Sequence, residues 1–181
     1  MKLLTVAIPC YNSSEYMDKS IRSAISGGDR VEVVVVDDGS SDNTLEIANK
    51  YQKKFPDIVK VVHQENGGHG EAVNTGIKNA TGLYFKVLDS DDCLGKNALQ
   101  KVLDLLEDMV SKDAGLDMLI SNFMYDKQGA KHKKIMKYKS AMPVGRMFGW
   151  DELHFGTSQY LLMHSVIYRT KVLRECKMQL P

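Results

Sequence analysis

The sequence has little cysteine and almost no net charge, and each shortage excludes a class of protein. Its three cysteines, Cys10, Cys93 and Cys176, are scattered and odd in number, which fits neither a disulfide framework nor a zinc site. The formal net charge of +1 gives no electrostatic basis for binding nucleic acid. No apolar run approaches the roughly eighteen residues that a membrane-spanning helix needs. We therefore expect a cytoplasmic protein without a nucleic acid partner.

The sequence does contain enough apolar residues for one domain, in alternating strand and helix patterns. Apolar residues make up 43% of the 181 positions, as is usual for a globular protein. Runs of β-branched and aromatic residues predict strands over residues 3–8, 31–36, 58–63 and 83–88. Helical spacing predicts a helix after each of them. This series predicts an α/β fold with a Rossmann-like, doubly wound, mostly parallel sheet.

The pattern changes after about residue 115. Residues 116–125 resemble one further strand, and residues 129–140 a basic hairpin or loop. Residues 160–168 are apolar and fit either a strand or a helix, and residues 170–176 fit a short helix. We expect one structural domain overall.

Polar or glycine-rich turns follow the four strands of the first half. The carboxyl ends of parallel strands meet at one edge of a sheet, where α/β proteins bind their ligands. The four turns are Pro9-Cys10-Tyr11-Asn12, Asp37-Asp38-Gly39-Ser40, Gly67-Gly68-His69-Gly70 and Asp89-Ser90-Asp91-Asp92.

The last of these turns places three carboxylates within four residues. Like charges about 4 Å apart repel by roughly 1 kcal/mol even in water. A bound cation removes that cost, and oxygen ligands suit Mg²⁺ or Mn²⁺. Lys86, three residues before Asp89, is a candidate to pair with it or with a phosphate. The same composition is also typical of a simple turn.

The other turns offer groups that suit a nucleotide. Tyr11 provides an aromatic face on which a base can stack. Asp37 and Asp38 can accept hydrogen bonds from a base or a ribose, and Gly67 and Gly68 allow close approach of the backbone before a helix N-terminus. Each feature alone also fits a structural role at the sheet edge. Together they predict a pocket for a nucleotide diphosphate.

In order and approximate spacing, these motifs resemble those of the inverting family 2 glycosyltransferases, which have the glycosyltransferase A-type fold. The resemblance covers roughly the first 110 residues. The segments that carry it are residues 6–12, 33–42, 66–68, 74–77, 80–82 and 88–92, together with Ala72.

The resemblance implies a role for each matching residue. Pro9 and Tyr11 would line the nucleobase, and Asp38, with Asp37 as a second candidate, would hold the base or ribose. Asp91 would bind a divalent metal, Mg²⁺ or Mn²⁺, with Asp89 close to the ribose, the sugar and this metal. The other residues expected to contact the donor are Asn12, Gly67, Gly68, Asn74, Lys86, Ser90 and Asp92.

The same resemblance implies the reaction and the partners. A sugar would pass, with inversion, from a nucleotide diphosphate, by family habit uridine diphosphate, to the hydroxyl of a carbohydrate or lipid-linked acceptor. Synthesis of a cell-envelope polysaccharide, with the full-length protein at the inner face of the membrane, fits this activity.

The acidic motif that supplies the family's general base is not found, and we expect the base beyond Pro181. Residues 1–114 would form the donor-binding half, and residues 115–181 the incomplete start of the acceptor half.

Three other hypotheses remain open. The first is a nucleotide-sugar-binding module without transfer activity. The second is a nucleotidyltransferase, although residues 10–13 lack the expected basic phosphate-activating loop. The third is a phospho-receiver domain, although the acid pairs follow the second and fourth strands rather than the first.

Overall fold

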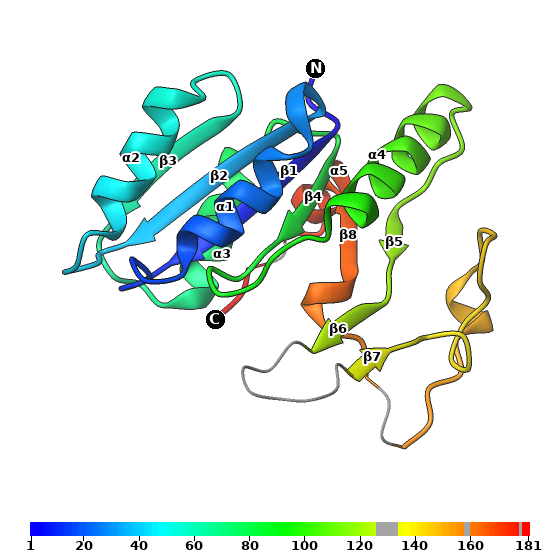
Figure 1. The fold of residues 1–181 in the computed structure, drawn as a ribbon. Coiled ribbons are helices and arrows are strands. Elements are labelled where there is room, and N and C mark those ends of the chain that lie inside the picture. Colours follow the sequence, from blue (N-terminus) through cyan, green and yellow to red (C-terminus); the bar gives the residue numbers. More distant parts are fainter. Residues whose placement is uncertain (126–133, 158–159, 178) are drawn as a thin grey trace. The chain divides into compact units, whose positions relative to one another are not determined.

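The computed structural model describes residues 1–125, 134–157, 160–177 and 179–181 (Figure 1). The chain divides into two compact units. The first contains Met1–Asp117 and Ile167–Pro181, and the second contains Met118–Val166. The predicted division into donor and acceptor halves at residues 114 and 115 stays a prediction.

The first unit is built on a mostly parallel sheet, as predicted. Its strands are β1 (Leu4–Cys10), β2 (Val31–Asp38), β3 (Val59–Gln64), β4 (Tyr84–Val87) and β8 (Val166–Arg169). They lie in the order β3-β2-β1-β4-β8. The strands from β1 to β4 are parallel to their neighbours, and β8 is antiparallel to β4.

Helices cover this sheet. They are α1 (Met17–Ile25), α2 (Thr44–Lys54), α3 (His69–Asn79), α4 (Lys96–Ser111) and α5 (Thr170–Glu175), with a 3₁₀ turn at Gly28–Arg30. Figure 1 shows α1 and α3 on opposite faces of β1 and β2. Every residue of β2 is buried, and such two-sided burial fits the valine run of residues 33–36. At Gly76, α3 approaches β1 so closely that an added Cβ would lie 2.7 Å from the Cβ of Ala7.

Two strands extend further than the sequence pattern predicts. The strand predicted over residues 3–8 stops before Pro9, but the ladder of β1 to β2 continues through the pairs Pro9–Val36 and Cys10–Asp37. One missing N–H donor does not end the strand, because the residues on either side continue the pairing. Asp37 and Asp38 are therefore the last residues of a buried strand rather than members of an exposed turn.

The second unit is small and contains β5 (Met118–Ile120), β6 (Phe123–Tyr125) and β7 (Lys134–Met136). The single strand predicted over residues 116–125 is wrong: it is split at Ser121 and Asn122. There the Ser121 N–H donates to the Ser165 carbonyl (2.8 Å), and the Asn122 side chain accepts the Tyr138 N–H (3.1 Å).

The sequence left two segments of this region undecided, residues 129–140 as a hairpin or loop and residues 160–168 as a strand or helix. β6 pairs antiparallel with β7, so the segment predicted as a hairpin or loop supplies one strand of a hairpin, while residues 129–133 lie outside the described residues. The apolar segment before β8 forms a 3₁₀ turn at Met163–Ser165. Among the described residues, no helix is both long and apolar enough to cross a membrane.

Candidate functional site

The polar turns predicted from the sequence gather at the carboxyl edge of the parallel sheet. The register places Cys10 beside Asp37 and Asp38 beside Gln64, so the ends of β1, β2 and β3 are level with one another. β4 pairs with β1 on the other side and leads into the acidic turn. The fold therefore brings groups from four separate segments to one edge.

Asp38 fixes the glycine turn that follows β3. One carboxylate oxygen accepts the Gly67 N–H (2.9 Å) and the Gln64 side-chain amide (2.7 Å), and the other accepts the Gly68 N–H (2.9 Å). Asp38 is 2% exposed, and Gly68 has a φ of 87°, a conformation that favours glycine. The Asp38 side chain is thus committed to contacts within the protein.

Asp37, its neighbour, is fully buried and only half satisfied. Its Oδ2 lies 2.7 Å from Nδ1 of His63, whereas Oδ1 is the one buried side-chain oxygen or nitrogen without a hydrogen bond in the described part of the chain. Burial, together with the nearby Asp37 charge, raises the pKa of the Cys10 thiol to about 12. Cys10 therefore stays a protonated thiol and is not a nucleophile.

The turn after β1 is tied to the turn after β2 through Asn12. Its side-chain oxygen accepts the Ser41 N–H (2.8 Å), and its own N–H donates to Oγ of Ser40 (3.0 Å). Asn12 has a φ of 47°, which asparagine tolerates better than most residues. Pro9 is buried within β1, while Tyr11 remains 54% exposed and free to present its ring at the edge.

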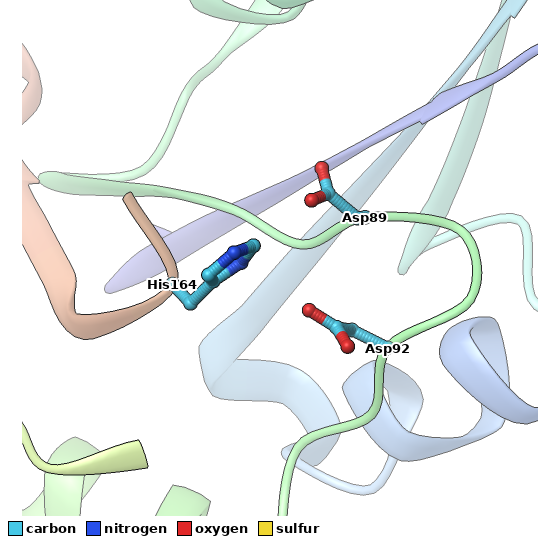
Figure 2. A group of neighbouring side chains, drawn as sticks. All are labelled: Asp89, Asp92 and His164. Atoms are coloured by element: carbon cyan, nitrogen blue, oxygen red, sulfur yellow. The ribbon is translucent and has the colours of Figure 1, made fainter. Parts of the chain in front are cut away.

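The acidic turn follows β4. Figure 2 shows the carboxylates of Asp89 and Asp92, which offer oxygens within 4.8 Å of one another. The Asp92 N–H donates to the Asp89 carbonyl, and Oδ1 of Asp89 lies 3.1 Å from Nε2 of His69 in α3. His164, also drawn in Figure 2, belongs to the second unit, where its ring lies 5.9 Å from that of Phe123.

The third carboxylate and the serine of this turn differ from that pair. Asp91 is exposed, and its carboxylate makes no hydrogen bond or ion pair within the described part of the chain. Oγ of Ser90 lies 2.9 Å from Oγ of the buried Ser13, which connects the acidic turn to the start of the chain.

Lys86 places a cation beneath the acidic turn. It lies within β4 and is 6% exposed. Burial lowers the pKa of its ammonium to about 8, and the charges of Asp92 and Asp89 oppose that shift. A buried lysine close to these carboxylates reduces the repulsion between them.

The structure places Asn74 in α3, and its side chain bonds the backbone of Leu180. The sequence did not single out His63 or His69, which hold Asp37 and Asp89. Their positions could have identified them, because His63 lies near the end of β3 and His69 directly follows the glycine turn.

The mostly parallel sheet with flanking helices and this set of strand-end turns match the A-type nucleotide-sugar transferase fold. The model of Glycosyl transferase family 2 matches residues 5–170, so the chain belongs to that family, as the motifs predicted.

Similar proteins agree with this assignment. An uncharacterized glycosyltransferase of Rickettsia felis is 34% identical over 149 residues, and the minor teichoic acid biosynthesis protein GgaA of Bacillus subtilis is 29% identical over 160 residues. These matches cover 80% and 84% of this chain but only 23% and 35% of those proteins.

Among solved structures, S. aureus TarS 1-349 is similar over all of this chain and half of its own, with a TM-score of 0.75 and 29% identity. TarS has also been solved in complex with UDP-GlcNAc; that structure gives a TM-score of 0.71 and 27% identity, with 49% of its chain covered.

Proposed function

We propose that this chain binds a uridine diphosphate sugar at the carboxyl edge of its sheet, as the donor part of an inverting glycosyltransferase. The supporting observation is that the Asp38-fixed glycine turn and the acidic turn meet at this edge, linked by His69 and Asp89. Family membership and the UDP-GlcNAc complex of TarS support the same ligand class.

The nucleoside end of the donor lies at the ends of β1 and β2 in this proposal. Tyr11 stacks on the base next to Pro9, and Asp37 accepts a hydrogen bond from the base or ribose through Oδ1. A ligand N–H or O–H there would relieve the cost of about 1–3 kcal/mol that an unpaired buried acceptor carries. Asp38 acts indirectly, because it holds the N–H groups of Gly67 and Gly68 in the turn that faces the phosphates.

The diphosphate end lies at the acidic turn. Asp89 and Asp91 would hold a divalent cation together with the diphosphate, and the all-oxygen donor set suits Mg²⁺ or Mn²⁺. Such a cation would supply Lewis-acid stabilisation to the leaving diphosphate. Asp92, whose charge acts on the buried Lys86, stabilises the acidic turn and lies near the transferred sugar. Ser90 connects this turn to the turn after β1, and Asn12 connects the turn after β1 to the turn after β2.

Transfer also needs an acceptor hydroxyl and a base that takes its proton. We assign no residue of this chain to that step. The name of GgaA supports an acceptor in a cell-envelope polymer, either a carbohydrate or a lipid-linked one. A peripheral position at the inner face of the membrane fits such an acceptor.

Thermal unfolding with ligand tests the donor site. We expect UDP with Mn²⁺ at about 100 times its Kd to stabilise the chain by about 2.7 kcal/mol. For a chain of this size that is a rise in Tm of roughly 5–10 °C. UDP with a chelator should give a much smaller rise, because the diphosphate would meet the carboxylates without a cation between them.

The control is Mn²⁺ alone, at the same concentration. No metal-dependent stabilisation by UDP would contradict the proposal. A larger metal-dependent response to UTP than to UDP would favour a nucleotidyltransferase instead.

A further inference from the structure

The segment after β8 runs back along α3 and is attached near both ends of that helix. At the end of α3, the Arg174 guanidinium donates to the carbonyls of Ile77 (3.2 Å) and Ala80 (2.6 Å). Midway along α3, Asn74 bonds Leu180 twice: Oδ1 accepts the Leu180 N–H (2.9 Å), and Nδ2 donates to the Leu180 carbonyl (3.0 Å). Beyond Leu180, Pro181 lies against Gly70 near the start of α3, so the segment reaches the carboxyl edge of the sheet.

The contact at that edge is unusually close. A Cβ added to Gly70 would lie 2.0 Å from the Pro181 carbonyl oxygen, so only glycine allows the backbone of Pro181 to lie there. Gly70 follows His69, whose ring contacts Asp89, and it lies two residues after Gly68 of the glycine turn. The Leu180–Pro181 backbone thus lies beside the turn that faces the proposed diphosphate.

A cavity of about 480 Å³ is lined by residues of α3 and of this segment, among them Glu71, Thr75, Lys78, Leu173 and Lys177. Among the described residues, the paired hydrogen bonds of Asn74 hold the backbone of Leu180.

We propose that Asn74 is a positioning residue, which holds Leu180 and Pro181 as a wall of the donor site and acts on the donor only through them. The inference rests on the proposed function. It replaces the direct contact between Asn74 and the donor that the family resemblance implies. The Asn74 amide has two donors and two acceptor sites. Leu180 takes one of each, and the second donor bonds Oε2 of Glu71 (3.1 Å), so a single acceptor site is left for a ligand.

A double-mutant cycle separates the two roles of Asn74. The Kd of UDP with Mn²⁺ is measured for the unchanged chain, for Asn74→Ala, for a chain lacking residues 179–181, and for the two changes combined. We expect each single change to weaken binding about tenfold and the combination to weaken it no further, because both remove the same wall. Asn79→Ala is the matched control, since Nδ2 of Asn79 bonds the Thr75 carbonyl within α3, and it should leave the Kd unchanged.

Three results would overturn the inference. Asn74→Ala that weakens binding equally in the shortened chain would assign Asn74 to the donor directly. Asn74→Ala that leaves binding unchanged would remove it from the site. If the unchanged chain fails to bind UDP, the proposed function fails as well.

Hydrogen exchange of the Leu180 amide distinguishes these failures, since it reports on the Asn74–Leu180 contact without any ligand. Asn74→Ala should speed that exchange. Asn74→Asp, which keeps an acceptor for the Leu180 N–H, should restore most of the protection. Exchange that is equally fast in the unchanged chain would show that the contact itself does not form.

Discussion

Asp91→Asn is expected to remove most of the metal-dependent part of UDP binding and to leave folding intact. Asparagine keeps the shape of the side chain but removes the anionic oxygen that a hard cation prefers. The metal-dependent affinity for UDP should fall at least roughly 10–100-fold, which is the usual effect of removing a residue that only hydrogen-bonds a metal ligand. Because Asp91 is exposed and has no hydrogen bond within the described part of the chain, its free energy of unfolding should change by no more than about 0.5 kcal/mol.

Calorimetric titration of UDP with Mn²⁺ and with a chelator measures this effect, and Asp92→Asn is the comparison. Asp92 lies on the same turn, but its charge acts on the buried Lys86. Asp92→Asn should therefore lower the free energy of unfolding and have a smaller effect on the affinity for Mn²⁺. If Asp92→Asn abolished the metal dependence and Asp91→Asn did not, the cation would belong to the Asp89–Asp92 pair.

Asp38→Ala is expected to destabilise the chain and to abolish UDP binding together. The substitution removes the shared acceptor of the Gly67 N–H, the Gly68 N–H and the Gln64 amide. Buried donors left without a partner cost about 1–3 kcal/mol each, and water can reach part of this exposed turn. We therefore expect a loss of about 2–4 kcal/mol, seen in urea as a lower midpoint with an unchanged m value.

Asp57→Ala is the matched control, because Asp57 is an exposed aspartate in the loop before β3, away from the carboxyl edge. It should change stability by no more than about 0.5 kcal/mol. Asp38→Ala with normal stability and normal UDP affinity would refute the view that Asp38 organises the glycine turn.

The sequence predicts the parallel sheet well because its signals are local and agree with one another. The valine run of β2, the apolar runs of its neighbours and the helical spacing between them each point to the same α/β series. The meeting of the glycine turn and the acidic turn follows from this, since strand ends lie at one edge of a parallel sheet.

The different roles of Asp37 and Asp38 do not follow from the sequence. Successive side chains of a strand point to opposite faces, so adjacent aspartates meet different neighbours. Which one reaches His63 and which reaches the glycine turn depends on the pairing of β2 with β3, residue 37 with 63 and residue 38 with 64.

The contact between Asn74 and Leu180 is also beyond prediction from local patterns. The two residues are 106 positions apart, and the contact depends on how α5 and its continuation pack along α3. The break at Ser121 and Asn122 has a similar origin, because their hydrogen-bond partners lie 44 and 16 positions away in the chain. Such contacts decide local structure without leaving a periodic signal.

Paramagnetic broadening by Mn²⁺ in the presence of UDP, followed on the amide signals of the labelled chain, locates the proposed cation. The signals of residues 67–70 and 89–92 should broaden first, and Asp91→Asn should suppress the effect. Signals at the opposite edge, such as those of Gly28–Arg30, should remain sharp. Broadening centred elsewhere, or broadening that does not depend on UDP, would contradict a nucleotide-diphosphate site at the carboxyl edge of this sheet.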